Sequence, residues 1–539
     1  MAAEPRFFIF GSSMVMSRRL LLLATIAACS KGPLMPTQTG GPPPPRPSLP
    51  QTYIPSGHAA AGDVFVHLFE WKWTDIASEC EKVLAPAGFT AVQVSPPQEH
   101  SITPSYDWSE RYQPVEYSVA LSRSGDSAQF VDMVTRCKNV GVGIYVDAVI
   151  NHMTNFPSPG VGSNGTSYSK YSYPGLYSSS DFHQPPCTVT DYSDAANVQD
   201  CELLSLPDLN TEKVSVRHKI ANYLIYLVDL GVAGFRIDAA KHVQQVSLDS
   251  IFWIVDSAVK AQGKPLPYYF LEVSSGFGEA LSPRDYFGEG YSSGASSDIT
   301  EFTFTGVGDK FLEKPGQYIA QLNPNGSPGN QFSETAWGLM PSDKAVVFLQ
   351  NHDTQHDDGT ISYRDGAVFR LANVWMLAQP YGYPSILSSY AFQRPAENSM
   401  GPPGDATGHT YDVTCAANPD SATDGQWVCE HREPYILHMV AFRKLVAGTN
   451  QNHWWDNGSE AIAFSRGSLG FVAINREDST VAATIATGMA AGHYCDLLTG
   501  GRSGTTCVGT LITVDSTHEI AVNLTAKTAI AIDTASEVP

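Results

Sequence analysis

Short apolar runs alternate with amphipathic stretches along the chain from about residue 62. The runs end at turns, as buried strands of a parallel sheet do, and the stretches between them repeat apolar residues at helical spacing. This alternation predicts an α/β architecture with a parallel sheet. The predicted helices are 73–84, 128–138 and 212–230, and the predicted strands are 64–68, 90–94, 143–147, 232–237, 267–272, 299–304, 345–350 and 384–388.

Eight predicted strands favour a closed (β/α)8 TIM barrel, which we expect to span 61–152 and 209–447. The stretch 153–208 is rich in Ser, Gly, Tyr and Asp and lacks the alternation. It is therefore expected to form an irregular inserted subdomain, subdomain B, after the third strand. Beyond it, a C-terminal all-β sandwich domain is predicted at 448–539, from short β runs between Gly-rich turns at 462–464, 470–474, 511–514 and 529–532.

The first 29 residues have the layout of an export signal: a basic start, a nearly apolar stretch at 20–28, and small residues before Cys29. The apolar stretch is too short to span a bilayer. Small residues before a cysteine resemble a bacterial lipobox, in which Cys29 would be lipidated and would anchor the chain to the outer membrane or cell surface. The alternative is an ordinary signal peptide that is cleaved nearby. Residues 30–60 are Pro-rich and are expected to be a disordered linker. The export signal at the start of the chain predicts a secreted protein.

The formal net charge is −21 at pH 7, which argues against a nucleic-acid partner because such proteins present a basic face. Simple solubility is the better explanation of this charge, although the charge also fits a neutral substrate. Eight cysteines remain after Cys29, and an even set in an exported chain favours disulfides. We expect sequence-local pairs, although the sequence alone leaves other pairings open: Cys80–Cys137, Cys187–Cys201, Cys415–Cys429 and Cys495–Cys507.

Three carboxylates, Asp238, Glu272 and Asp353, each follow a predicted strand. The carboxyl ends of barrel strands meet at one mouth, where active sites of this fold lie. Cleavage of a glycosidic bond needs a nucleophile or base, a proton donor, and negative charge near an oxocarbenium-like transition state. A lone Asp at a strand end is more often a helix cap or a surface charge, but three acids at one mouth favour catalysis. Arg236 precedes Asp238 by two residues, so both project to the same side of a strand, and we expect the guanidinium to keep Asp238 ionised.

Four sequence blocks occur in order at 147–152, 234–242, 270–273 and 348–353. Together they resemble the α-amylase family of retaining glycoside hydrolases. Further stretches at 67–71, 92–97, 110–114 and 427–432 are similar to the animal and actinobacterial type. The resemblance runs from about 62 to the C-terminus and implies an endo-hydrolase of internal α-1,4-glucosidic bonds in starch, glycogen and related glucans.

The resemblance also implies a role for each acid. Asp238 would be the nucleophile, Glu272 the acid and base, and Asp353 a ligand of the distorted sugar. The nearest alternative is another reaction of the superfamily, such as oligosaccharide-forming hydrolysis or transglycosylation. A non-catalytic glucan-binding protein is the alternative from another class, but such proteins typically lose one of the acids. A monomer is expected.

Substrate-binding positions are implied by the same motifs: Trp108, Tyr112, Gln113, His152, Arg236, Lys241, His242 and His352. Trp108 is followed by Ser109, where the animal pattern has a second tryptophan, so part of the stacking platform is missing.

Two ion sites follow from the resemblance. For Ca2+, Asn151 and Asp208 would supply side-chain oxygens and Gln199 and His242 backbone carbonyls, an all-oxygen set that suits calcium; the plainer alternative is that Asn151 and Asp208 cap turns. Animal members hold a chloride between two arginines and an asparagine. Arg236 and Asn351 match two of these, but the third position is expected at Ala367, so no chloride requirement is predicted unless Arg370, one turn away, fills the place.

Overall fold

The computed structural model describes residues 52–287 and 297–539. The expected export segment 1–29, including Cys29, and most of the expected linker 30–60 lie outside the described residues. In the described parts of the chain, no helix is both long enough and apolar enough to cross a membrane.

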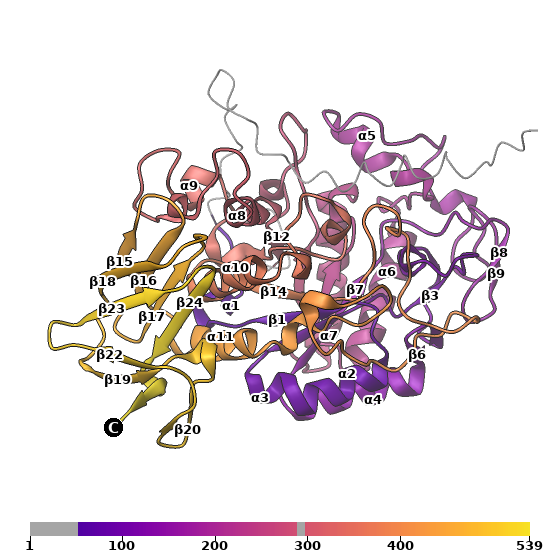
Figure 1. The fold of residues 1–539 in the computed structure, drawn as a ribbon. Helices are drawn as coiled ribbons and strands as arrows, with labels where there is room; N and C mark the ends of the chain where they lie inside the picture. Colours follow the sequence, from indigo (N-terminus) through magenta and orange to yellow (C-terminus); the bar gives the residue numbers. More distant parts are fainter. Residues whose placement is uncertain (1–51, 288–296) are drawn as a thin grey trace, which may run out of the picture.

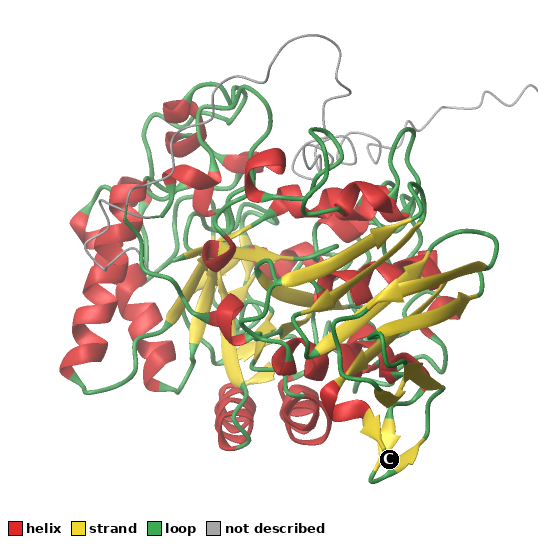
Figure 2. Ribbon diagram, turned by 90° about the vertical axis from the view of Figure 1, so that its left-hand side faces the viewer, coloured by secondary structure: helices red, strands yellow, loops and turns green. Residues whose placement is uncertain are grey.

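Eight parallel strands close into a barrel in the order β1-β14-β13-β12-β11-β10-β7-β2. They are β1 (Phe65–Leu68), β2 (Ala91–Val94), β7 (Gly143–Ala148), β10 (Gly234–Ile237), β11 (Tyr268–Leu271), β12 (Asp298–Thr300), β13 (Ala345–Val347) and β14 (Tyr383–Ser388). Each overlaps one of the predicted apolar runs, so the predicted (β/α)8 barrel is confirmed (Figure 2). The strands are mainly apolar because both of their faces are buried.

Buried side chains, most of them large, fill the interior of the barrel. Those of one cluster are Phe65, Ala91, Tyr145, Phe270, Val346 and Tyr383. The barrel is thus a packed core rather than a pore, and a site can only lie at the rim.

Helices surround the barrel (Figure 1). The longer ones are α2 (Trp73–Glu79), α4 (Ser127–Asn139), α6 (Val214–Asp229), α7 (Gln245–Ala261), α8 (Gly306–Phe311), α10 (Ala367–Ala378) and α11 (Pro434–Leu445); α1 (His58–Ala61), α3 (Ala85–Ala87) and α9 (Glu334–Trp337) are short. The predicted helix 73–84 is α2 continued by a π-helical segment, Cys80–Leu84. A capping box between Asp126 and Gln129 starts α4.

All four expected disulfides are present: Cys80–Cys137, Cys187–Cys201, Cys415–Cys429 and Cys495–Cys507. The first links the π-helical segment that continues α2 to α4, its neighbour in the outer ring.

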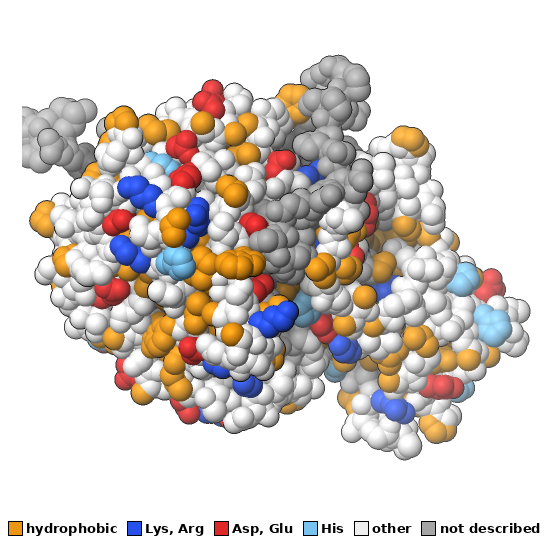
Figure 3. Space-filling view, turned by 180° about the vertical axis from the view of Figure 1, so that it is seen from behind, with side chains coloured by type: hydrophobic (Ala, Val, Ile, Leu, Met, Phe, Trp, Pro, Cys, Tyr) orange, Lys and Arg blue, Asp and Glu red, His pale blue; other side chains and the backbone are white. Residues whose placement is uncertain are grey.

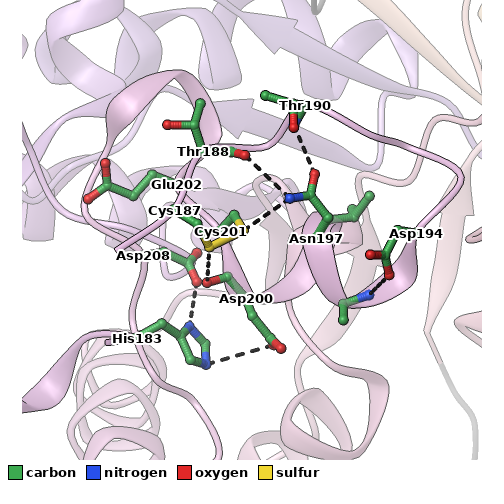
Figure 4. Close-up of a disulfide and its surroundings, with 12 residues drawn as sticks. His183, Cys187, Thr188, Thr190, Asp194, Asn197, Asp200, Cys201, Glu202 and Asp208 are labelled. Atoms are coloured by element: carbon green, nitrogen blue, oxygen red, sulfur yellow. Dashed lines mark hydrogen bonds and ion pairs between the residues drawn. A yellow bond between two sulfur atoms is a disulfide. The ribbon is translucent and has the colours of Figure 1, made fainter. Parts of the chain in front are cut away.

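Subdomain B leaves the barrel after β7 and returns at α6, as predicted. Its regular elements are the hairpin β8 (Gly160–Val161) and β9 (Ser167–Tyr168) and the helix α5 (Ala195–Asp200). The two ends of the insertion pair with each other: Met153 N donates to Pro207 O at 3.1 Å, and Leu209 N donates to Asn151 O at 3.0 Å. The Cys187–Cys201 disulfide closes the loop that carries α5 (Figure 4). This pairing fixes the insertion on the rim of the barrel, at the end of the molecule opposite the C-terminal strands (Figure 1).

The loop after β2 carries two small hairpins, β3 (Glu99–His100) with β4 (Pro114–Glu116) and β5 (Leu121–Ser122) with β6 (Gly125–Asp126). Several of the expected substrate-binding residues lie in this loop.

The C-terminal region is a sandwich of two antiparallel sheets, as predicted. One sheet holds β15 (Gln451–Asp456), β16 (Ala461–Arg466), β17 (Gly470–Asn475) and β24 (Thr528–Asp533); the other holds β18 (Val481–Ala486), β23 (Glu519–Leu524), β22 (Leu511–Val514), β19 (Gly492–Cys495) and β25 (Glu537–Val538), with the hairpin β20 (Arg502–Ser503) and β21 (Thr506–Cys507) beside them. Side chains such as Phe471, Tyr494 and Ile532 from both sheets form the core between them.

The sandwich and the barrel share apolar packing. Ile462, Phe464 and Val472 belong to the same buried cluster as the barrel helices. A Cβ atom on Gly470 would lie 2.6 Å from the ring of Phe442 in α11, so only glycine lets the strand approach the helix this closely. On the face seen from behind, acidic and basic side chains are interspersed over both parts (Figure 3).

Candidate active site

Four acids at the carboxyl ends of barrel strands lie at one mouth. Asp147 lies in β7, Asp238 and Glu272 directly follow β10 and β11, and Asp353 follows β13. β7, β10 and β11 are neighbours in the barrel, so their carboxyl ends lie side by side. The sequence prediction of one converging set of acids agrees with this geometry.

A single buried guanidinium holds the four carboxylates. Arg236 Nη1 lies 2.7 Å from Asp147 Oδ1 and 3.0 Å from Asp238 Oδ1. Arg236 Nη2 lies 2.9 Å from Glu272 Oε1 and 4.0 Å from Asp353 Oδ2. The expected contact between Arg236 and Asp238 is therefore present, and the same cation also serves three other acids.

The pKa values in this group respond to burial and crowding. Burial raises the pKa of Asp238 well above its usual range; Arg236 opposes the rise, and the charges of Glu272 and Asp147 add to it. Burial and the charge of Glu272 raise the pKa of Asp353 to about 7. Arg236 therefore favours the ionised form of Asp238, as expected, but this cation is shared among four acids and burial acts against it. The group favours retaining a proton near neutral pH.

Asp147 is fully buried and accepts hydrogen bonds on both oxygens. Tyr112 OH donates to its Oδ2 at 3.0 Å and Gln93 Nε2 at 3.2 Å, while Arg236 occupies the other oxygen. Asp147 therefore fixes the guanidinium and the Tyr112 ring in place. Glu272 is more accessible, and its Oε2 accepts from the backbone N–H of Ala239 at 2.8 Å.

An aromatic wall stands beside these acids. The rings of Tyr112 and His352 stack with centroids 5.0 Å apart, and His352 Nε2 lies 3.4 Å from Asp353 Oδ2. Both ring nitrogens of His152 have protein partners, the backbone oxygen of Tyr112 at 2.9 Å and Asn151 Nδ2 at 3.3 Å. Burial lowers the pKa of His152 to about 4, so the ring is neutral at pH 7. In this arrangement His152 supports Tyr112.

The expected platform residue Trp108 has one face covered. Its ring stacks on His356 at 5.0 Å, and its Nε1 donates to the backbone oxygen of Asn398 at 2.9 Å. Gln113 Oε1 accepts from Thr154 Oγ1 at 3.1 Å and from the backbone N–H of Phe156 at 3.2 Å, so this side chain fixes the start of subdomain B.

Lys241 and His242 lie where the barrel meets subdomain B. Lys241 Nζ pairs with Glu279 and lies 4.8 Å from the centroid of the Tyr192 ring. His242 Nδ1 bonds the backbone oxygen of Val198 in α5 at 2.8 Å. The sequence analysis missed Tyr192 and Glu279, since nothing in their local sequence reveals that they meet Lys241.

The expected calcium ligands also converge. Asn151 and Asp208 lie on the two paired ends of the insertion, and α5, which carries Gln199, packs on the turn that carries His242. Asp208 is buried, and within the described structure its Oδ1 has no hydrogen-bond partner. Burial raises the pKa of Asp208 to about 7, although the hydrogen bond from His183 to its other oxygen opposes the rise. An unpaired buried carboxylate oxygen among carbonyl groups fits a hard divalent cation.

A second polar cluster adjoins this site (Figure 4). His183 Nδ1 lies 2.6 Å from Asp208 Oδ2, and His183 Nε2 lies 2.9 Å from Glu212 Oε2 and 3.9 Å from Asp200 Oδ1. Ligand atoms of His183, Asp200 and Glu212 lie within 4.8 Å of one another, a spacing that a metal ion could use. Burial lowers the pKa of His183, but the hydrogen bonds to Asp208 and Glu212 outweigh it and raise the pKa to about 10. The protonated ring itself then neutralises this cluster.

The expected third chloride position is wrong. A cavity of about 20 Å³ beside Arg236 and Asn351 is lined on the β14 side by Ser385. Ala367 opens α10 and is not among the described residues that line this cavity. The alternative with Arg370 is also wrong, because its Nη1 pairs with Asp420 at 2.7 Å. The sequence resemblance assigned the third chloride position to Ala367 in α10, whereas in the barrel it is Ser385 in β14 that lies at the cavity.

A closed barrel that presents several acids and a stacked aromatic wall at one mouth is the architecture of a glycoside hydrolase. The sequence matches the family of the α-amylase catalytic domain over residues 84–379 and that of the α-amylase C-terminal all-β domain over 453–535. The chain therefore belongs to the α-amylase family.

Individual relatives agree. The chain is 42% identical over 474 residues to pancreatic alpha-amylase 2a5 of Mus musculus, covering 84% of this chain and 90% of that protein. It is 42% identical over 472 residues to an alpha-amylase of Pecten maximus, covering 85% and 89%. A solved structure of an alpha-amylase I variant from Eisenia fetida, in complex with maltohexaose, has a TM-score of 0.80 and 34% identity, and covers 91% of this chain and 100% of that one.

Proposed function

We propose that the protein is an endo-acting α-amylase that hydrolyses internal α-1,4-glucosidic bonds of starch, glycogen and related glucans with retention. The contact of Asp238 and Glu272 with one buried guanidinium is the observation that carries this proposal. Retaining enzymes need two carboxylates close enough to act on the same anomeric carbon. The maltohexaose complex of the Eisenia fetida relative supports an α-glucan substrate.

In this mechanism Asp238 attacks the anomeric carbon as the bond to the leaving sugar breaks, and Glu272 donates its proton to the leaving oxygen. Glu272 then removes a proton from water, which attacks the same carbon and releases Asp238. Asp353, beside His352, would bind the sugar hydroxyls and stabilise its distorted form.

We propose Ca2+ at Asn151, Gln199, Asp208 and His242. The free Asp208 oxygen and the convergence of three segments support this assignment. Bound there, the ion would supply a structural charge that clamps subdomain B to the barrel. No chloride requirement is proposed, because Ser385 supplies no positive charge and Arg236 is already committed to acids. Strong activation in a halide titration would contradict this.

Outside the described residues, we propose that the chain is exported and that Cys29 is lipidated, which mass spectrometry of the mature N-terminus would test. A monomer is proposed for the mature protein.

The function is tested with purified protein and soluble starch. Internal cleavage predicts a rapid fall in chain length before small sugars accumulate, and retention predicts that NMR detects the α-anomer first. Early release of a single short product would favour the oligosaccharide-forming alternative. Binding of starch without new reducing ends would favour the non-catalytic one.

A further inference from the structure

The loop that leaves the acid Glu272, residues 273–282, carries an unusual aromatic side chain. Phe277 is 75% exposed, the largest exposure of any large apolar side chain in the described chain. No other ring of the described residues lies against it. Gly276 and Gly278 flank it, and Gly278 has a φ of 81°, a conformation that favours glycine. The phenyl ring therefore stands free of the core on a segment whose backbone can adjust.

This loop is anchored on both sides of Phe277. Before it lies Glu272, whose backbone oxygen accepts from the N–H of Lys241 at 3.3 Å. After it, Glu279 pairs with Lys241 Nζ, and Ala280 N donates to the backbone oxygen of Tyr192 in subdomain B at 2.9 Å. Phe277 is five residues from Glu272 and two from Glu279, so its Cα lies within about 18 Å of the first and about 8 Å of the second. The loop that carries Phe277 is thus held beside Lys241 and Tyr192, close to the mouth.

The barrel order tells which side of the mouth this is. The wall of Tyr112 and His352 comes from the loops after β2 and β13. The loop with Phe277 comes from β11, and its anchors Lys241 and Tyr192 come from the segment after β10 and from subdomain B. In the proposed mechanism Glu272 protonates the oxygen of the departing sugar, so the segment that continues from Glu272 borders the leaving-group side.

We propose that Phe277 is a stacking platform for the glucose units on the leaving-group side of the cleaved bond. The apolar face of a pyranose ring fits an exposed phenyl ring. Single exposed apolar residues are common on protein surfaces, but Phe277 differs from the others because its loop continues directly from Glu272. Lys241 and Glu279, the ion pair that anchors the same loop, would supply hydrogen-bonding groups for the sugar hydroxyls. The platform rests on the proposed function, and it gives this enzyme a preference for long leaving fragments and for sugar acceptors in transfer.

The test compares Phe277→Ala with Phe277→Trp on reducing-end-labelled maltoheptaose, scoring which bond is cut. Phe277→Ala is expected to lower cleavages that release long labelled fragments about fivefold relative to those that release short ones, and to lower transfer to maltotriose by a similar factor. Phe277→Trp restores both. α-Maltotriosyl fluoride has no leaving sugar, so its kcat/KM should be the same in the wild type and both variants.

Trp253→Ala is the matched control, because Trp253 is 54% exposed on the outer helix α7. An unchanged cleavage pattern in Phe277→Ala, an equal loss on maltotriosyl fluoride, or an equal shift in Trp253→Ala would overturn the platform and leave the proposed function standing. Failure of the wild type to hydrolyse both starch and maltotriosyl fluoride would overturn the proposed function itself.

Discussion

The mouth of the barrel and the outer end of α2 both bury carboxylates against arginine, but in opposite proportions. At the mouth one guanidinium, Arg236, serves four acids. At α2 a single acid, Glu79, accepts from Arg432 Nε at 2.7 Å and from His431 Nε2 at 2.8 Å.

The two environments shift pKa values in opposite directions. Burial and crowding raise the pKa of Asp238 and Asp353. Burial also acts to raise the pKa of Glu79, but the hydrogen bonds from His431 and Arg432 outweigh it and lower the pKa to about 2. The ratio of acids to donors, rather than burial alone, therefore separates a reactive group from a structural one.

If the crowded mouth is the reactive region, removing its nucleophile has the largest effect. Asp238→Asn should lower kcat on maltoheptaose by at least about 10⁴-fold, because the amide does not form the glycosyl-enzyme. Glu272→Gln should be similarly impaired on glucans. Retained binding of maltohexaose and an unchanged Tm serve as controls. Residual activity within about tenfold of the wild type would place the reaction elsewhere.

Changing the shared cation tests the crowding directly. Arg236→Met removes the one cation that contacts all four carboxylates and should cost about 3–5 kcal/mol in the free energy of unfolding at pH 7. Arg236→Lys keeps the charge but loses the planar fork, so it should lose less stability while still losing activity. Urea unfolding and starch hydrolysis measure the two effects. Equal stability of Arg236→Met and the wild type would mean that the acids are already protonated.

At the base of subdomain B the ratio of acids to donors lies between those of the mouth and of Glu79, because the acid Asp208 has one cationic partner, His183. If Asp208 holds calcium, chelation should lower the free energy of unfolding by about 4 kcal/mol when the ion was at a thousandfold excess over its Kd. Thermal scans with and without chelator measure this. Asp208→Asn should remove the calcium response, whereas Glu212→Gln, which changes only a contact of His183, should keep it. A calcium response that survives in Asp208→Asn would refute the assigned ligand set.

Substitution of Glu79, which has two donors for one acid, should have the smallest effect on stability, and this effect should depend on pH. The folded-state pKa of Glu79 is lower than its ordinary 4.5, so its contribution is present above pH 4.5 and is lost as the pH falls towards 2. Glu79→Gln should cost about 2–3 kcal/mol at pH 7. The difference in urea unfolding between wild type and variant should shrink below pH 4.5. A difference that stays constant down to pH 3 would contradict the lowered pKa.

Most of the fold could be predicted from sequence because the barrel strands are buried on both faces and read as continuous apolar runs. Strands of the sandwich such as β18 and β23 escaped prediction. In β23 buried Ile520 and Val522 alternate with exposed residues, and β18 is built from small residues that give little hydrophobic signal.

The acids of the site could be predicted because each follows a strand, and strand ends of a barrel meet. Contacts between distant segments could not. Ser385 lines the cavity beside Arg236 because of barrel register, and Tyr192 meets Lys241 because subdomain B folds back over the rim. His152 and Gln113 carry the expected identities, but their partners in the structure, the Tyr112 backbone and the start of subdomain B, follow only from three-dimensional packing.

The packing of β16 and β17 on α10 and α11 has a practical consequence for anyone who engineers this chain. Ile462 and Phe464 belong to the same buried cluster as the barrel helices, and Arg466 donates to the backbone oxygen of Ala378 at the end of α10 at 2.5 Å. A truncation after α11 would expose the apolar surface that the sandwich covers and would remove the hydrogen bond from Arg466. The shortened enzyme should therefore aggregate. The sandwich is therefore part of the fold of the catalytic domain and should not be exchanged between enzymes as an independent module.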